Sequence, residues 1–262
     1  MTKKPKSDYA IQTVSNALRL LEMFDGEGRL GVTELSRRLD LHKNNVIRLL
    51  ATLEQRGYIE QSAEDDQYRL AVGCLELGHS YQRSNLLLEL ARPALWKLST
   101  ELGETAHLAV SRGDEVIHLE GVRPERMLVA SLRLGACLPL HATALGKVLL
   151  AFASEERREA FDRERITAGL SARTAATLVD RAKLLDELGS AAAQGFAVDL
   201  EECEPGLVCA AAPVRDASGA IHAALSVSAP LARVSADDLH RRMVPGAEAA
   251  AAEFSGRLGF VG

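Results

Sequence analysis

The sequence predicts an α+β protein in which an N-terminal helical domain precedes a larger domain with one antiparallel sheet faced by helices. Three observations predict this class. Apolar residues recur at helical spacing in three segments between residues 11 and 57. The spacing changes to short extended runs after Gly57. From residue 105, strand-like runs are followed by helical runs and then by strand-like runs again, which is typical of an α+β domain.

Composition places the chain among soluble proteins. Hydrophobic residues make up 47% and charged residues 26% of the 262 residues, and no apolar run approaches the roughly 18–20 residues of a membrane-spanning helix. The basic N-terminus, residues 1–12, has no apolar core behind it and does not match a secretory signal, so we expect a cytoplasmic protein. No C-x-x-C pair occurs, and we expect reduced thiols at Cys74, Cys137, Cys203 and Cys209.

The first three helices are predicted over residues 11–24, over residues 32–41 and within residues 41–60. Thr33 is a plausible N-cap of the second helix. A tight turn at residues 40–41 leads into the third helix, which Gly57 ends. The third helix has an apolar stripe at i, i+3, i+4 and i+7, formed by Val46, Leu49, Leu50 and Leu53.

Two short extended runs, YIEQ and YRLA, flank the polar segment SAEDDQ and predict a β-hairpin. Three helices and a hairpin within about 60 residues are typical of a winged helix-turn-helix, which we assign to residues 1–70. The tip of the hairpin is acidic, which disfavours contact with phosphate. We therefore expect the third helix to make most of the contact with DNA.

The third helix begins with side chains that reach and form hydrogen bonds. Asn can bond adenine through two hydrogen bonds, Lys can reach guanine or phosphate, and the helix dipole favours phosphate at this end. Residues 37–56 carry a local charge of +3, although residues 1–70 are neutral overall. The alternative is a solvated polar cluster without a ligand. The candidate DNA-binding residues are Thr33, His42, Lys43, Asn44, Asn45 and Arg48.

A linker helix is predicted over residues 71–84, and residues 85–262 form the second domain. A helix that joins two domains is a natural dimer contact, and two recognition helices one DNA turn apart bind more tightly than one. Strand-like runs in the second domain include 105–112, 114–122 and 126–133, and Ser218-Gly219 is predicted to turn the last two strands into a hairpin. An Ala-rich helix over 235–258 ends the chain, and the buried positions of the helix after the linker are predicted at Leu87, Leu90, Leu95 and Leu98.

Several stretches, taken in order, carry a resemblance to a known family: ALRLLEMF, VTELSRRLDLHKNNVIRLLATLEQRGYIE, YRLAVGCLELG, ARPALWKLSTELGETAHLAV, LPLHATALGKVLLA, GFAVDLEE, GLVCAAAPVRD and ALSVSAP. The chain resembles the IclR family of bacterial transcriptional regulators nearly from end to end. The resemblance implies a winged helix-turn-helix, a linker helix and a GAF-like effector domain. It also implies a double-stranded DNA operator, homodimers that often pair as homotetramers, and a small organic effector. It leaves open whether the protein is a repressor or an activator.

An effector pocket is expected in the second domain. Ser226 and Ser228 lie on one face of a strand, and buried hydroxyls need partners that a carboxylate or hydroxyl ligand would supply. The alternative is that they bond the backbone or each other. In LPLHATALGK, the free backbone N–H groups of a helix start are suited to an anion. The resemblance implies effector contacts at Met127, Leu138, Ala144, Leu145, Asp199, Leu207, Cys209, Ser226 and Ser228.

The size and charge of the effector stay open. The pair Ala144-Leu145 replaces a smaller pair that is common in the family, so Leu145 would shrink or reshape the pocket. A small keto acid and a larger aromatic acid are both compatible with this. Asp199 would repel an anion unless it bonds a hydroxyl or is protonated, which favours an effector with donor and acceptor groups.

Two rival functions follow from other residue combinations. A cysteine hydrolase would use Cys209, His141 and Asp199, but Cys209 lies within an apolar strand and His141 in an apolar flank, so we expect no enzyme. A metal-responsive regulator of the same architecture would draw ligands from Cys203, Cys209, Asp199, Glu201, Glu202 and His141. No pair among these has a recognised metal spacing, and we expect neither a metal nor another cofactor.

Overall fold

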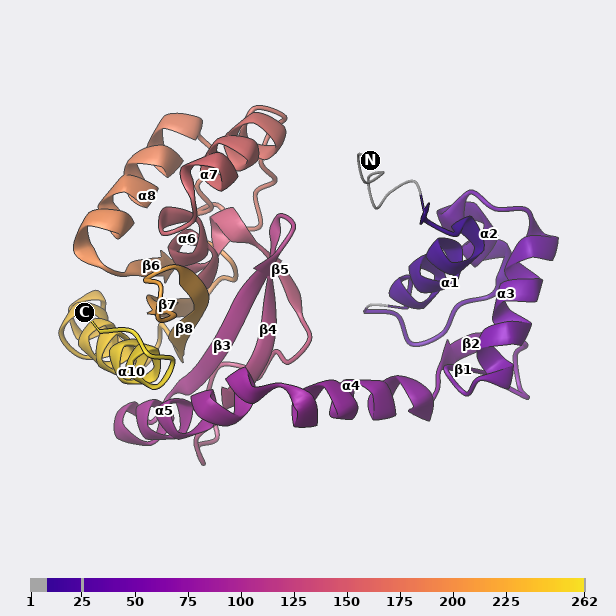
Figure 1. The fold of residues 1–262 in the computed structure, drawn as a ribbon, viewed down its shortest axis with the longest axis horizontal. Coiled ribbons are helices and arrows are strands. Elements are labelled where there is room, and N and C mark those ends of the chain that lie inside the picture. The colour runs from indigo at the N-terminus through magenta and orange to yellow at the C-terminus, as the bar shows by residue number, and fades with distance from the viewer. Residues whose placement is uncertain (1–8, 25, 262) are drawn as a thin grey trace, which may run out of the picture. The chain divides into compact units, whose positions relative to one another are not determined.

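The computed structural model describes residues 9–24 and 26–261. The chain separates into two compact units, Met1–Asn85 and Leu86–Gly262, and Figure 1 labels the elements of each. The basic stretch 1–7 at the N-terminus lies outside the described residues. Within the described part, no helix is long and apolar enough to cross a membrane.

The first unit is a three-helix core followed by a hairpin and one further helix. The strands β1 and β2 pair antiparallel, with Ile59 opposite Leu70, and Leu30 adds an isolated bridge to Tyr68. The hairpin predicted between residues 58 and 71 is therefore confirmed. The elements are α1 (Gln12–Glu22), α2 (Val32–Leu39), α3 (Lys43–Gln55), β1 (Ile59–Gln61), β2 (Tyr68–Leu70) and α4 (Val72–Ser84).

The apolar stripes of the three helices meet in one core. The four stripe residues of α3 are all buried, together with Leu35 and Leu39 of α2. After α3, Gly57 adopts φ +74° and the N–H groups of Gly57 and Tyr58 bond the carbonyls of Glu54 and Leu53. This is a Schellman ending, as the glycine predicted.

The N-cap prediction for α2 is wrong. The N-cap is Gly31, which makes no side-chain capping bond, and Thr33 lies exposed in the first turn of the helix. Its hydroxyl therefore is not used to satisfy a free N–H group at the helix start, although it stays available at the surface.

The second unit contains a six-stranded antiparallel sheet in the order β5-β4-β3-β8-β7-β6. The Ser218-Gly219 turn joins β7 and β8, with Gly219 at φ +81°. The strands are β3 (Thr105–Arg112), β4 (Glu115–Val122), β5 (Cys137–Pro139), β6 (Ala197–Leu200), β7 (Leu207–Arg215) and β8 (Ile221–Pro230). The helical segments are α5 (Leu86–Leu102), η2 (Leu140–Ala142), α6 (Ala144–Ala151), α7 (Glu155–Phe161), η3 (Asp162–Ile166), α8 (Arg181–Gln194), α9 (Ala236–Asp238), η4 (Leu239–Met243) and α10 (Val244–Arg257).

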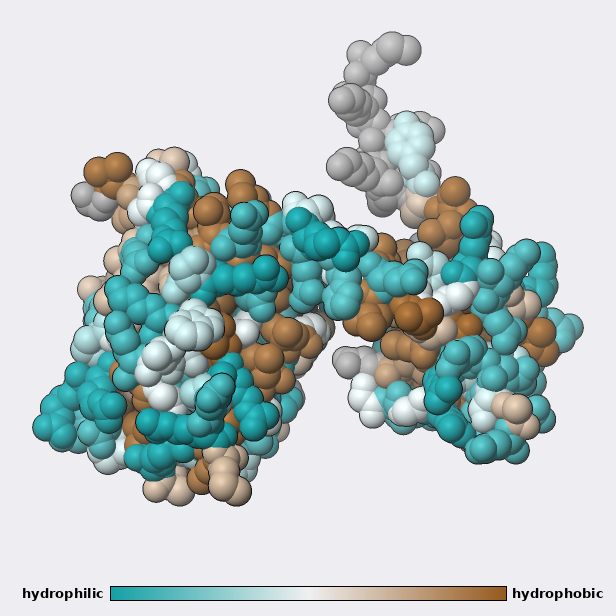
Figure 2. Space-filling view, turned by 90° about the horizontal axis from the view of Figure 1, so that it is seen from below, coloured by the Kyte–Doolittle hydropathy of each residue, from teal (hydrophilic) through white to brown (hydrophobic). Residues whose placement is uncertain are grey.

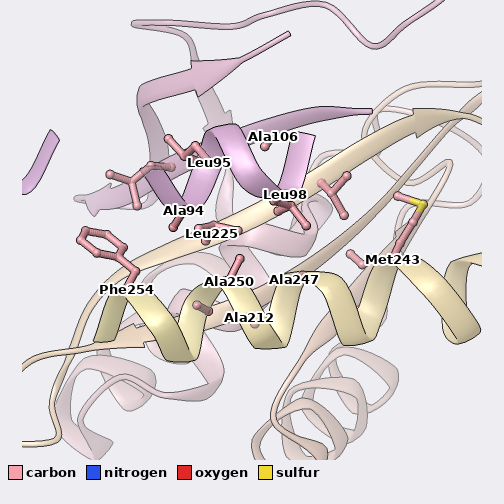
Figure 3. Packing of buried hydrophobic residues seen from close by; sticks show 14 of the residues in the cluster. Ala94, Leu95, Leu98, Ala106, Ala212, Leu225, Met243, Ala247, Ala250 and Phe254 are labelled. Carbon is pink, nitrogen blue, oxygen red and sulfur yellow. The ribbon is translucent and has the colours of Figure 1, made fainter. Parts of the chain in front are cut away.

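Helices cover both faces of this sheet. On one face, α5 and α10 pack on alternate residues of the strands, and Figure 3 shows Leu95 and Leu98 of α5 with Leu225 of β8 and Phe254 of α10. On the other face, α6, α7 and α8 pack on a second cluster that includes Ala224 of β8. Because strand side chains alternate, the face that carries Ala224 also carries Ser226 and Ser228.

Two predictions for the second unit need correction. Residues 126–133 form a loop and not a strand, because β4 already pairs with β3 on one side and β5 on the other. In α5, Leu95 and Leu98 are buried as predicted, but Leu87 and Leu90 are only half-buried and Leu88 is buried instead.

Candidate functional site

The start of α3 presents polar side chains at the surface of the first unit. Burial of Val46 and Leu50 on the inner face turns the opposite face outward. Lys43, Asn44 and Asn45 are exposed in the first turn. Within the described residues, the side chains of these three make no hydrogen bond or ion pair to the chain, so their full bonding capacity is free for a ligand.

His42 differs from its neighbours because it caps the helix. Its Nδ1 accepts a hydrogen bond from the backbone N–H of Asn44 at 3.3 Å, and its carbonyl accepts from Asn45 at 2.9 Å. The exposed ring therefore orders the helix start and leaves Nε2 as its free polar atom. Arg48 lies exposed one turn later, beside Asn45 in a polar groove between α1 and α3.

Part of the local positive charge is neutralised within α2. Glu34 accepts hydrogen bonds from Arg37 at 2.7 Å and from Arg38 at 2.5 Å, and these bonds lower the pKa of Glu34 to about 2. The cations of the candidate interface are consequently Lys43 and Arg48 of α3. At the hairpin tip, Arg29 pairs with Asp65 at 3.0 Å.

A small cavity, partly open to solvent, lies in the second unit on the sheet face that carries Ser226 and Ser228. Its volume is about 30 Å³, against roughly 10–15 Å³ on the same measure for one buried water. The enclosed space therefore favours a small ligand. The lining residues are His107, His118, Ala130, Ser131, Arg133, Leu138, Thr143, Ala144, Leu145, Asp199, Cys203, Leu207, Cys209, Ser226 and Ser228.

The structure brings eight of the nine candidate effector residues to this cavity. The exception is Met127, which is fully exposed in the loop after β4 and does not line the cavity. Its neighbours in the loop do reach the cavity, because Thr105 Oγ1 donates to the carbonyl of Ala130 at 2.7 Å and holds the loop against the sheet. The expectation that Met127 forms an apolar wall is thus corrected for this structure.

Sequence reasoning missed the two histidines and the arginine of the cavity. His107 lies on β3, His118 on β4, and their rings meet edge to face with centroids 5.1 Å apart. Arg133 comes from the loop and pairs with Glu204. The alternation in TAHLAV, which puts His107 on the same strand face as Thr105, was the signal that could have identified His107.

The helix start at the cavity is tightly built. Thr143 caps α6, and its Oγ1 accepts a hydrogen bond from the N–H of Gly146 at 3.0 Å. We expected the N–H groups of this helix start to be free for an anion, but that of Gly146 is already bonded. A Cβ at Gly146 would lie 2.1 Å from the carbonyl oxygen of Leu140. Glycine is therefore required for the close approach of this turn to η2.

Asp199 is buried at the cavity wall. Its Oδ1 accepts from the backbone N–H of Glu202 at 2.7 Å and of Cys203 at 3.4 Å. Burial raises the pKa of Asp199 to about 7; the Glu202 carboxylate adds to the rise, and the two backbone N–H groups and Lys147 oppose it. Asp199 is therefore partly protonated near neutral pH and can then donate a hydrogen bond.

A buried ion pair supports this wall from behind. The fully buried Lys147 Nζ donates to Glu202 Oε1 at 2.7 Å and to Glu187 Oε1 at 2.9 Å. Burial raises the pKa of Glu202 even though Lys147 lowers it. The ammonium holds the turn after β6, and with it Asp199, in position.

The arrangement does not assemble a cysteine hydrolase. Burial raises the pKa of the Cys209 thiol, so the thiolate is disfavoured. His141 lines a different cavity, and its Nε2 lies 3.1 Å from the carbonyl oxygen of Ser171. Among residues 9–24 and 26–261, no group of three His, Cys, Asp or Glu side chains is placed to hold a metal ion.

A winged helix-turn-helix that presents a free polar helix start defines a DNA-binding protein of the transcriptional-regulator class. Comparison with known proteins agrees. The model of the IclR helix-turn-helix domain matches residues 13–63, and that of the bacterial transcriptional regulator IclR C-terminal domain matches residues 79–256. The chain therefore belongs to the IclR family of bacterial transcriptional regulators.

Individual relatives support the same assignment. The HTH-type transcriptional regulator XynR of Escherichia coli is 36% identical over 227 residues, which are 86% of this chain and 88% of that protein. The transcriptional repressor IclR of E. coli is 33% identical over 87% of this chain and 83% of its own length. An IclR homologue of Microbacterium hydrocarbonoxydans, solved in complex with 4-hydroxybenzoate, has 26% identity and a TM-score of 0.77 over 94% of this chain and 98% of that one. The two E. coli relatives are transcriptional regulators, which is the class that the two family models also describe.

Proposed function

We propose that the chain regulates transcription through an operator that it occupies or leaves according to a small organic acid bound in the cavity of the second unit. The observation that carries this proposal is the convergence of eight candidate residues on one cavity that contains an unpartnered hydroxyl. Ser226 Oγ is buried and has no hydrogen-bond partner. A ligand in the cavity would supply that partner.

The cavity favours a small acid over an aromatic one. A related protein was solved in complex with 4-hydroxybenzoate, but the volume of about 30 Å³ found here corresponds to about two to three waters at roughly 10–15 Å³ each. Leu145 is buried at the wall and occupies the space that a smaller residue would leave. A keto or hydroxy acid of two to four carbons thus fits with the least rearrangement.

We also propose that the protein acts in the cytoplasm as a homodimer, which can pair into a homotetramer. A two-fold operator is read by two recognition helices, and α4 supplies a surface that a second copy can cover. Figure 2 shows hydrophobic residues at the surface where this helix runs. The large apolar residues exposed on α4 are Val72, Leu75, Leu77 and Tyr81.

The test combines ligand binding and DNA binding in one set of variants. A thermal-shift screen of small carboxylic acids identifies the effector, because a ligand that binds only the folded chain raises its melting temperature. Fluorescence anisotropy at fixed salt then measures affinity for DNA from the region of the chain's own gene. The double substitution Ser226→Ala and Ser228→Ala is expected to weaken the response to the acid at least tenfold while ligand-free DNA affinity stays the same. A full response in this double variant would contradict the cavity assignment.

A further inference from the structure

Two unpartnered polar groups lie side by side on the floor of the cavity. His107 of β3 and Ser226 of β8 are paired residues across the two antiparallel strands. Both side chains are at least 98% buried and both line the cavity. No well-formed hydrogen bond reaches either ring nitrogen of His107 or the Oγ of Ser226, although the Ser131 backbone lies near the His107 ring. Buried polar groups are rarely left unpaired, so these three atoms indicate where a missing partner binds.

The chemistry of the pair selects the kind of partner. Burial is the main cause that lowers the pKa of His107 to about 3; His118 and Arg133 add to the effect, and the nearby Ser131 backbone opposes it weakly. The imidazole is therefore neutral near pH 7, with one N–H donor and one acceptor nitrogen, and the serine hydroxyl also donates and accepts. A ligand hydroxyl matches two such groups, because it donates one hydrogen bond and accepts another. A carboxylate or keto oxygen can only accept hydrogen bonds. It would therefore leave an acceptor atom of His107 or Ser226 without a donor.

The rest of the cavity provides for an acid group. Arg133 is the cation that lines the cavity, and its partner Glu204 is about half exposed, so the guanidinium can exchange this carboxylate for that of a ligand. Ser228 lies two residues from Ser226 on the same strand face and adds a second hydroxyl. The lining thus combines the pair of unpaired polar groups with a second hydroxyl and a cation.

We propose that His107 and Ser226 recognise a hydroxyl group of the effector, so that the effector is a hydroxy acid of two to four carbons whose carboxylate pairs with Arg133. This inference rests on the proposed function, since it names the class of acid that the same cavity binds. His107 is the specificity-determining residue, and the small volume favours a short hydroxy acid.

Four three-carbon acids, three of which differ only at C2, test the inference. Lactate carries a hydroxyl there, pyruvate a keto oxygen and propionate neither, and glycerate adds a second hydroxyl at C3. Isothermal titration calorimetry with the full chain at pH 7.5 and fixed salt is expected to show a hydroxy acid, in at least one enantiomer, binding about tenfold or more tightly than propionate and pyruvate. A buried polar group left unpaired typically costs about this much affinity.

The variants separate recognition of the hydroxyl from folding. His107→Leu removes both ring nitrogens at similar volume, and Ser226→Ala removes one hydroxyl, so each should bring the preference for the hydroxy acid over propionate to within about threefold of unity. His107→Gln keeps a donor and an acceptor and should retain the preference. Ser99→Ala is the matched control, because Ser99 Oγ is also buried without a partner but does not line the cavity.

Each of the other outcomes contradicts either the hydroxyl-selective pair or the proposed function. If wild-type protein binds propionate as tightly as both hydroxy acids, or if His107→Leu keeps the preference, the hydroxyl-selective pair is refuted while an acid effector survives. If His107→Leu loses all four acids equally, with DNA affinity intact, His107 has a structural role only and the inference also fails. If no acid of the screen binds and none changes operator affinity, the proposed function itself fails.

Discussion

Replacement of His107 by Leu is expected to stabilise the ligand-free protein, although it damages the cavity. In the folded chain His107 is 2% exposed and neither ring nitrogen makes a well-formed hydrogen bond. An unsatisfied buried polar group lowers the free energy of unfolding by about 1–3 kcal/mol, and a leucine of similar volume removes this cost. The different shape of the leucine side chain typically costs less than about 1.5 kcal/mol. At pH 7.5 we therefore expect the free energy of unfolding to rise by about 1 kcal/mol, which raises the melting temperature by about 2–4 °C for a unit of this size.

The gain should grow as the pH falls, and the sign follows from proton binding. The ordinary pKa of histidine is 6.5, and burial lowers that of His107 to about 3 in the folded state. Between these values the unfolded chain binds a proton that the folded chain does not, so wild-type stability falls as the pH drops below about 6.5. At pH 5 this loss amounts to about 2 kcal/mol. The leucine variant has no such group and keeps this stability. His118 titrates in both proteins, so its contribution cancels from the difference in unfolding free energy between them.

Urea unfolding at pH 7.5 and at pH 5 measures both effects. Trp96 is the single tryptophan of the sequence and lies on α5, so its fluorescence reports the second unit. Ser99→Ala is the control, because it removes another unpartnered buried hydroxyl without a titrating group and should show no change between the two pH values. A destabilised His107→Leu protein, or a difference that does not widen at pH 5, would refute the reasoning about the unpaired ring.

Further substitutions probe the other parts of the molecule. The double substitution Asn44→Ala and Asn45→Ala should cost about 1–3 kcal/mol of operator affinity for each lost base contact, measured by anisotropy, and should leave the melting temperature unchanged. Unchanged operator affinity would show that these two residues of α3 do not recognise bases. Lys147→Met should destabilise the second unit by about 3–5 kcal/mol in urea unfolding, because the buried Glu202 loses its counter-ion, and near-wild-type stability would show that this carboxyl is already neutral. Gly146→Ala should cost about 1–3 kcal/mol or more by the same assay, since its Cβ would overlap the Leu140 backbone, and a neutral result would mean that η2 can shift.

Local signals carried the prediction of the first unit. The apolar stripe of α3 and the glycine at position 57 act within a few residues, so spacing alone predicted the helix, its end and its exposed polar start. The cap of α2 was wrong because Gly31 and Thr33 are both plausible caps and only the backbone path distinguishes them. Sequence reasoning also could not show that Arg37 and Arg38 are paired with Glu34, because rotamers and not spacing decide this.

The cavity was predictable only in part. Ser226 and Ser228 followed from the two-residue period of one strand, and six other residues came from the family resemblance. Met127 was misplaced because residues 126–133 read as a strand, yet both neighbouring positions beside β4 were already occupied. His107 and Arg133 were missed because neither belongs to a local motif of the cavity.

By itself, the amino-acid order determined that the chain binds DNA through a winged helix-turn-helix and that an α+β unit follows, since periodicity, turns and caps are properties of short segments. Only the tertiary structure decided which polar groups share a cavity and which are left without partners. The physical reason is that strand pairing brings His107 beside Ser226 across more than a hundred residues of chain. Whether a buried ring nitrogen has a partner depends on that pairing and on the loop that closes over it.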